Sequence, residues 1–228
     1  LEGGGYLFPG QAAMTAMARD RLAEWGCPDR PIQFTEMGWP SYTVSEEDQG
    51  RWLARSFLLA ARDGVEGWFW YTFWDGEPTT TGPRPHENYF GLFGWPFDPV
   101  DPRRPKPSWR AFEALATVLG EARFARDASA MLGLPDDVHV LTFVRPDGSL
   151  LLAAWDGRDM PDVGPEGVGP GGPGTTHELV LSLPPGIRTV RLRTLDGTPP
   201  EDRDASGSLT LLLRPTVQVV EVLGESAR

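Results

Sequence analysis

The fold is indicated first by residues 31–41, which read PIQFTEMGWPS. The run from Ile32 to Thr35 is too short for a helix and is rich in residues that favour strands. Glycine, proline and polar residues follow it, so the sequence predicts a strand that runs directly into a loop. Glu36 stands at this junction. Strict alternation along the strand would place Glu36 on the same face as Ile32 and Phe34.

Three helices and a second strand are expected around this junction. Apolar residues recur at near-helical spacing in each helix, and Ser45 with Asp48 three residues later forms a variant capping box. Residues 67–74, GWFWYTFW, have almost no polar position and predict a strand buried on both faces. The expected helices cover residues 11–25, 45–64 and 108–120. Such alternation of helix and strand is typical of a parallel sheet with helices outside it.

The pattern changes after Gly120 to the two-residue period of strands. Residues 145–148, RPDG, predict a hairpin turn, and proline and glycine separate the later strands. The expected strands cover residues 138–144, 149–155, 178–183, 187–195, 208–213 and 216–223. This half is therefore expected to be an antiparallel β domain. Residues 156–176 are so rich in glycine and proline that we expect a mobile loop there, without helix or strand ladder.

Composition argues against several classes of function. The formal net charge is −11 and Lys106 is the single lysine, so a nucleic-acid partner is not expected. Cys27 is the only cysteine, which excludes an intrachain disulfide and a cysteine-based zinc site. No apolar run approaches the roughly 20 residues that span a bilayer, so no membrane partner is expected. No motif for a metal or a phosphate-bearing cofactor is present, and no compartment is indicated.

Position makes Glu36 a candidate for chemistry. A carboxylate at the C-terminal end of a parallel strand points into the mouth of a (β/α)8 barrel, where the loops between strands and helices build active sites. The plainer interpretation is an exposed glutamate at the end of a strand, and position alone favours that interpretation. The residues around Glu36 change the balance.

Four motifs, in the right order and spacing, resemble those of the retaining (β/α)8 glycoside hydrolases of the xylosidase- and cellulase-like clan. Residues 34–41, FTEMGWPS, resemble the nucleophile motif of the seventh strand in this clan. Residues 68–75 look like its eighth strand. ENYFGL at 87–92 and PKPSW at 105–109 are similar to its passage into the last helix. The resemblance covers residues 15–120, the last quarter to third of a barrel that typically needs about 250 residues.

The resemblance implies both a fold and a function. The expected fold is α/β plus all-β: residues 1–120 form the last two β/α units of an incomplete (β/α)8 barrel, and residues 121–228 form an antiparallel β-sandwich. Retaining hydrolysis uses two carboxyl groups about 5–5.5 Å apart. Glu36 matches the nucleophile, whereas the Asn-Glu pair that supplies the acid/base in this clan is missing. The chain is therefore expected to be a piece of an enzyme that cleaves β-linked O-glycosidic bonds, inactive until an upstream barrel segment completes it.

Aromatic side chains are the candidates for carbohydrate binding, because the C–H groups of a sugar ring pack on aromatic faces. Trp74 is the best candidate for a subsite floor, with ordinary barrel core as the alternative. For Trp68 and Trp70, deeper in the strand, core is favoured. Loop residues at the same rim could line a subsite or simply pack or be solvated: Trp39, Tyr42, Tyr89 and His86.

Two functions of other classes stay open. The chain could be a non-catalytic carbohydrate-binding or structural module in which the β domain folds alone. It could also be a soluble α/β-plus-β protein without sugar chemistry. The Asn-Glu pair of the fourth strand separates these hypotheses, because an upstream reading frame that encodes six further β/α units would favour the enzyme.

Overall fold

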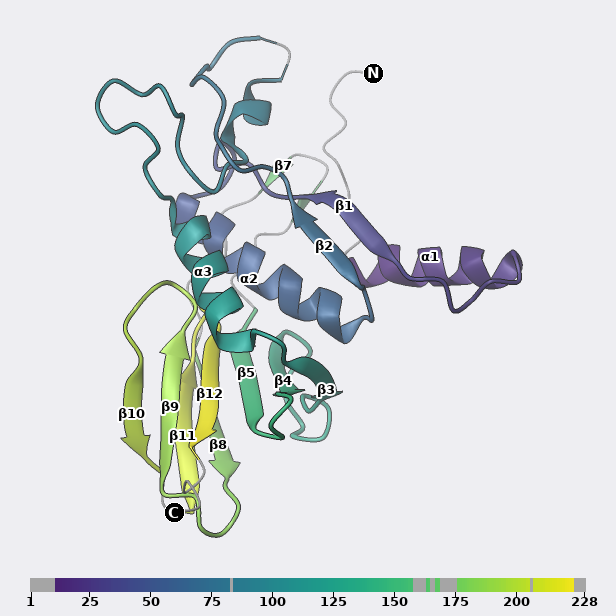
Figure 1. The fold of residues 1–228 in the computed structure, drawn as a ribbon, viewed down its shortest axis with the longest axis vertical. Helices are drawn as coiled ribbons and strands as arrows, with labels where there is room; N and C mark the ends of the chain where they lie inside the picture. The colour runs from purple at the N-terminus through teal and green to yellow at the C-terminus, as the bar shows by residue number, and fades with distance from the viewer. Residues whose placement is uncertain are drawn as a thin grey trace. The chain divides into compact units, whose positions relative to one another are not determined.

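The computed structural model describes residues 11–82, 84–157, 163–164, 167–168, 176–205 and 207–223. The chain forms two compact units (Figure 1). The first unit comprises residues 1–109 and 161–170, and the second comprises residues 110–160 and 171–228.

The first unit contains a short parallel strand pair with helices. Its elements are α1 (Gln11–Glu24), β1 (Gln33–Met37), α2 (Glu46–Arg62), β2 (Gly67–Trp70) and the 3-10 helix η1 (Pro85–Tyr89), and α3 (Pro107–Leu119) begins in it. β1 pairs with β2 in parallel, and α2 runs beside the pair (Figure 1). The predicted alternation of helix and strand is confirmed. The capping box is confirmed as well, because the Asp48 amide donates to Ser45 Oγ at 3.0 Å.

The second predicted strand is shorter than expected. β2 ends at Trp70, and residues 71–74 add only an isolated bridge between Trp74 and Phe93. The ladder with β1 does not continue past this point, because the main chain of Thr72 and Phe73 bonds to residues 90–93 instead of to β1. The apolar composition of residues 67–74 thus reflects contacts with a loop as well as with a strand.

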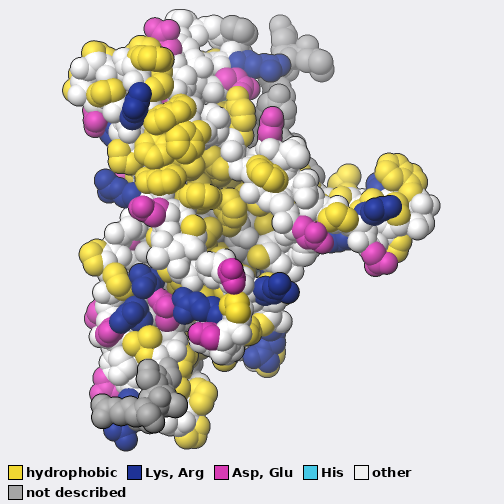
Figure 2. Space-filling view, viewed as in Figure 1, with side chains coloured by type: hydrophobic (Ala, Val, Ile, Leu, Met, Phe, Trp, Pro, Cys, Tyr) yellow, Lys and Arg dark blue, Asp and Glu magenta, His cyan; other side chains and the backbone are white. Residues whose placement is uncertain are grey.

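Burial on both faces of this strand is wrong for the described part of the chain. Trp68 lies between Phe34 of β1 and Phe57 of α2, with ring centroids 5.4 and 6.0 Å away, so α2 covers this face. On the opposite face, the described residues leave Phe69 54 % exposed, and Phe73, beyond the strand, 48 % exposed. Figure 2 shows hydrophobic side chains gathered on the surface of this unit. A sheet of two strands with helices on one side leaves its second face open.

The apolar stripe of α1 is also partly uncovered. The helix forms as predicted, but Met17 is 62 % exposed, and Trp25, just beyond the helix, is 75 % exposed. Arg19 attaches the helix to its own unit by donating to the carbonyl oxygens of Arg30 and Gly64, each at 2.9 Å. Polar contacts therefore carry part of the attachment that an apolar face usually supplies.

The second unit is built from antiparallel strands, as predicted. Its strands are β3 (Arg123–Asp127), β4 (Val138–Val144), β5 (Leu150–Asp156), β8 (His177–Ser182), β9 (Thr189–Thr194), β10 (Glu201–Asp204), β11 (Ser208–Leu213) and β12 (Gln218–Leu223). Six of them form one sheet in the order β10-β9-β12-β5-β4-β3, and β11 pairs with β8. The predicted hairpin turn is present, with Gly148 at φ +83° donating to the Arg145 carbonyl at 2.9 Å.

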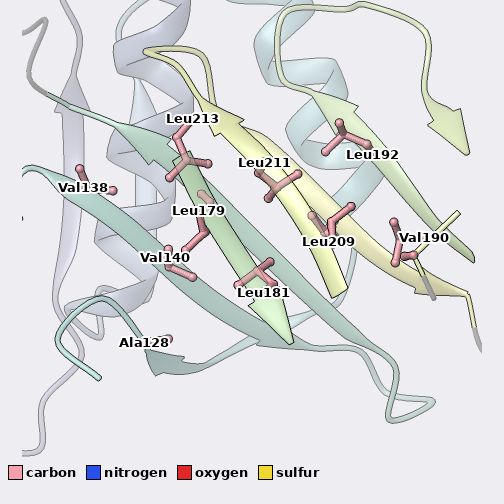
Figure 3. Packing of buried hydrophobic residues seen from close by; sticks show 13 residues of the cluster. Ala128, Val138, Val140, Leu179, Leu181, Val190, Leu192, Leu209, Leu211 and Leu213 are labelled. Atoms are coloured by element: carbon pink, nitrogen blue, oxygen red, sulfur yellow. The ribbon is translucent and has the colours of Figure 1, made fainter. Parts of the chain in front are cut away.

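Alternating side chains of the two sheets form one shared core (Figure 3). In β11 every second residue is buried, which leaves Thr210 on the outside and Leu209 and Leu211 in the core. They meet Val140 of β4 and Leu181 of β8 in the same cluster. Each such side chain contributes about 1.5–3 kcal/mol when fully buried.

The sequence pattern does not predict the two edge strands. β3 reads RFARD and β10 reads EDRD, so charged residues dominate both edge strands of the six-stranded sheet. Charged edge strands discourage pairing with other chains, so their composition follows from their place in the sheet.

The segment rich in glycine and proline, 156–176, lies mostly outside the described residues, and so does the predicted mobile loop. Within it, β6 (Val163–Gly164) and β7 (Gly167–Val168) form a short antiparallel pair. The expectation that this segment forms no ladder is wrong for these residues. Strands of two residues need few hydrogen bonds, so even a segment rich in glycine and proline can form them.

We expect Glu221→Gln to destabilise the second unit by about 1–3 kcal/mol at neutral pH, because it removes a buried carboxylate from between two guanidinium groups. Glu221 accepts hydrogen bonds from Arg145, at 2.9 Å, and from Arg193. Burial opposes ionisation, but the two arginines outweigh it and lower the pKa of Glu221 below its ordinary 4.5. This stabilisation is therefore present above pH 4.5 and is lost as the pH falls through the lowered pKa.

Amide hydrogen exchange in β5 and β12 measures this loss as a free energy of opening. Glu178→Gln, on an exposed position of β8, is the matched control and should change little. A variant whose β12 amides keep their protection at neutral pH would contradict the prediction.

Candidate active site

A bulge in β1 decides where Glu36 lies. Phe34 pairs with Trp68 and Met37 pairs with Trp70, with a register shift between them. Trp68 and Trp70 are two residues apart and share a face, so Phe34 and Met37 share it although they are three residues apart. Thr35 and Glu36 together therefore lie opposite Phe69, on the open face of the pair.

The predicted strict alternation is consequently wrong. Ile32 is 7 % exposed, Phe34 packs on Trp68, and both differ from Glu36, whose side chain is exposed. The extra residue of the bulge turns Glu36 away from the helix side. Glu36 lies at the C-terminal end of a parallel strand, as predicted, but the bulge determines on which face of the strand its side chain lies.

Gly38 allows the chain to leave β1 close to the end of β2. The Met37 carbonyl accepts from the Tyr71 amide at 2.9 Å. A Cβ atom at position 38 would overlap the Tyr71 carbonyl oxygen and would lie 3.1 Å from Phe90 Cδ1. A glycine at position 38 is thus required by a close backbone approach.

We expect Gly38→Ala to destabilise the first unit by about 1–3 kcal/mol, because the added methyl group must push two main-chain segments apart. Gly94→Ala is the matched control, since its Cβ would lie 3.7 Å from its nearest neighbours, Cβ and the carbonyl oxygen of Arg104. The free energies of unfolding of the two variants, measured in urea on the full-length protein, test this. Equal losses in both variants would contradict the steric account.

The structure places Trp39 against the α2 helix. Its ring lies 5.8 Å from that of Trp52 and 5.9 Å from that of Trp70. Trp52 is buried, so one side of Trp39 is used in packing. Both of the roles weighed for Trp39 stay open, because the ring itself is only partly buried.

Tyr42 and Tyr89 are brought together although they are 47 positions apart in the sequence. Their ring centroids are 5.3 Å apart, and the Tyr89 hydroxyl donates to the Thr79 carbonyl at 3.1 Å. Tyr42 is 43 % exposed. His86 lies in η1, the 3-10 helix that ends at Tyr89, and its Nε2 is 3.6 Å from the Glu87 carboxylate. We call Tyr42 and Tyr89 the tyrosine pair.

Trp74 lies among aromatic rings of its own unit. Phe73 and Phe93 have ring centroids 4.8 and 5.1 Å from it, and Trp109 is 4.8 Å from Phe93. Trp74 is partly buried, so packing leaves part of the residue exposed.

Sequence reasoning missed a buried polar network around Lys106. The Lys106 side chain is fully buried, and Nζ donates to both carboxylate oxygens of Asp75 at 3.1 Å and to Ser41 Oγ at 2.9 Å. Burial raises the pKa of Asp75 and lowers the pKa of Lys106, each against the attraction of its partner. The signal in the sequence was the only lysine of the chain, placed between two prolines.

A second ion pair lies next to this network. Arg104 donates twice to Glu46, at 2.7 and 2.6 Å, and thereby ties the loop before α3 to the first turn of α2. Burial opposes ionisation of Glu46, but the Arg104 guanidinium lowers its pKa below the ordinary value. A pocket beside the pair is lined by both residues and also by Trp95 and Asp98.

The described residues contain no group of three or more histidine, cysteine, aspartate or glutamate side chains that could hold a metal ion. Across the same described ranges, no helix has the length and apolarity to cross a membrane.

No protein-family model matches this sequence, and no curated protein matches it. Solved structures do match. A family 39 glycoside hydrolase from the gut symbiont Bacteroides cellulosilyticus is 25 % identical, with a TM-score of 0.65 over 93 % of this chain and 37 % of that chain. A family 39 β-xylosidase from Caulobacter crescentus is 16 % identical, with a TM-score of 0.53 over 93 % of this chain and 48 % of that chain.

A third similar structure is the catalytic domain of the family 30 xylanase C from Talaromyces cellulolyticus. It is 12 % identical, with a TM-score of 0.53 over 86 % of this chain and 41 % of that chain. The chain therefore spans less than half the length of each of these structures. Over about nine tenths of its own length it shares the fold of part of the barrel glycoside hydrolases, which confirms the predicted resemblance.

Proposed function

We propose that residues 1–120 are the last two β/α units of the barrel of a retaining glycoside hydrolase, that residues 121–228 are its β-sandwich domain, and that Glu36 is its nucleophile. The observation that carries this proposal is the bulge of β1. It supports the assignment because it sets Glu36 on the open face of a parallel pair, opposite Phe69, at the C-terminal end of the strand. The similarity to a family 39 glycoside hydrolase supports the same conclusion.

The chemistry proposed for Glu36 is nucleophilic attack on an anomeric carbon. One carboxylate oxygen forms the bond to the sugar while the bond to the leaving oxygen breaks, and a second carboxylic acid protonates that oxygen. Water then hydrolyses the glycosyl-enzyme with the second residue acting as base, so the β configuration is retained. The second carboxyl group is proposed to belong to the upstream segment, because no Asn-Glu pair occurs in this sequence.

The proposed substrate contacts are aromatic. Tyr42 lies on the loop that follows β1, packs against Tyr89 and offers a partly exposed ring to a sugar face. Trp74 and Trp39 are proposed as further stacking surfaces, and His86 as a hydrogen-bond partner of a sugar hydroxyl. Carbohydrate is accordingly the proposed partner of this unit.

Labelling with a mechanism-based 2-fluoro sugar tests the assignment. Such a reagent reacts with the nucleophile and leaves a stable glycosyl-enzyme, because the fluorine slows its hydrolysis. In the full-length protein we expect the label on the peptide that contains residues 33–37, located by mass spectrometry. Label on another carboxylate would refute the role of Glu36, and Glu36→Gln should take up no label.

A further inference from the structure

The carbonyl oxygen of Tyr89 collects four hydrogen-bond donors. The Ser41 amide donates to it at 3.0 Å and Ser41 Oγ at 3.2 Å. Gln49 Nε2 of α2 donates at 3.1 Å, and Lys106 Nζ donates at 3.2 Å. The loop after β1, helix α2 and the segment before α3 therefore converge on one main-chain atom.

Stability does not explain a lysine at this place. An ammonium group taken out of water costs several kcal/mol, and an apolar side chain of similar length would avoid this cost. The Lys106 side chain is fully buried, and the Asp75 carboxylate that compensates it is 10 % exposed. The ammonium supplies three directed donors instead, and they point to Asp75, Ser41 and Tyr89.

Two of the groups bound by Lys106 belong to the tyrosine pair or adjoin it in the sequence. Ser41 directly precedes Tyr42, and the Tyr89 carbonyl belongs to the second ring of the pair. Gln49 Nε2 also donates to the Trp39 carbonyl at 2.7 Å. The buried side chains of Gln49 and Lys106 therefore hold the loop from Trp39 to Tyr42 by hydrogen bonds. The charged groups near Lys106 from the neighbouring elements are Asp75, Glu46 and Arg104.

We propose that Lys106 is a positioning residue, which holds the tyrosine pair in the arrangement that binds the sugar. This inference rests on the proposed function and extends it to a residue that touches no substrate. Because Lys106 acts through the loop after β1 and not through Glu36 itself, its loss should weaken substrate binding more than it slows the chemical step.

The test uses the full-length protein and four variants. Lys106→Met removes the donors, and Asp75→Asn/Lys106→Met removes both buried charges. Lys106→Arg keeps a cation, and Arg104→Met removes a neighbouring cation that makes no bond to Tyr89. Melting temperature, kcat and KM for an aryl β-glycoside, and the number of sites titrated by the fluoro sugar are measured for each.

We expect Lys106→Met to lower the melting temperature and to raise KM about tenfold or more, with a smaller change of kcat per titrated site. The double variant should recover stability, because no buried charge is left without a partner, while its KM stays high. Lys106→Arg should restore part of the loss in KM, and Arg104→Met should leave KM unchanged.

Two results would overturn the inference: an unchanged KM in Lys106→Met, or a double variant in which KM recovers together with stability. Amide hydrogen exchange separates this inference from the proposed function. If the wild-type protein cleaves no glycoside, the proposed function fails, and the role in substrate binding fails with it. Faster exchange of residues 39–45 and 86–92 in Lys106→Met would still support the holding role of Lys106, and unchanged exchange would refute it.

Discussion

Replacement of Glu36 by glutamine in the full-length protein is expected to lower turnover of a β-glycoside by several orders of magnitude. Glutamine keeps the size and the hydrogen-bonding shape of the side chain but has no charged oxygen to attack the anomeric carbon. The register of β1 and β2 supports a specific effect, because Glu36 is exposed on the open face and the described residues show no hydrogen bond that its side chain would lose. The variant should therefore fold as the wild type does.

The matched control for this variant is Glu66→Gln. Glu66 is also exposed, but it precedes β2 and so lies at the opposite end of the parallel pair, where its amide donates to the Ile32 carbonyl. Steady-state kinetics and melting temperatures of both variants separate loss of chemistry from loss of fold. Near-normal activity of Glu36→Gln would refute the assignment.

Azide gives an independent test of the same role. In Glu36→Ala, azide can occupy the vacated space and attack the anomeric carbon from the face that the carboxylate would use. The expected product is a glycosyl azide of inverted configuration, identified by nuclear magnetic resonance. Recovery of turnover with azide in Glu36→Ala, but not in the wild type, is the outcome that the proposal requires.

The 228-residue chain, expressed alone, is expected to self-associate or to keep a loosely packed first unit. A parallel pair of two strands leaves unpaired main-chain groups along both edges, and such edges pair readily with other chains. Phe69, Tyr71 and Phe73 are 54, 38 and 48 % exposed, and Met17 and Trp25 add exposed apolar surface. Contiguous apolar patches of this kind are rare on stable monomers.

Light scattering after size-exclusion chromatography measures the association, and hydrogen exchange locates the loose part. We expect low protection in β1 and β2 and high protection in β4, β5 and β12, whose side chains form the shared core. The second unit serves as the internal control. A monodisperse monomer in which both units unfold cooperatively would contradict this prediction.

Sequence reasoning predicted the elements whose side chains obey one period. β11 alternates strictly between exposed and buried residues, and α2 has both a capping box and an apolar stripe, so both were found within a few residues. β3 and β10 were missed because edge strands carry charge instead of alternation. The strand at 67–74 was predicted too long because its last residues bond to a loop, which composition alone does not reveal.

The candidate site was predicted in part for similar reasons. The motif identified Glu36 and the loop aromatics, but its physical basis in the close approach at Gly38 emerged only from the structure. The face of Glu36 was predicted wrongly, because a bulge leaves no mark in the alternation. Lys106 was missed because its partners, Ser41, Asp75 and Tyr89, are far from it in the sequence.

The bulge in β1 makes the direction of a side chain depend on a count of residues. Between the pairs Phe34 with Trp68 and Met37 with Trp70, two residues of β1 stand opposite one residue of β2. If β1 continued past Phe34 without the bulge, strict alternation would turn Glu36 to the side of α2 and Met37 to the open face. Length is thus as much a part of this motif as the identity of its residues.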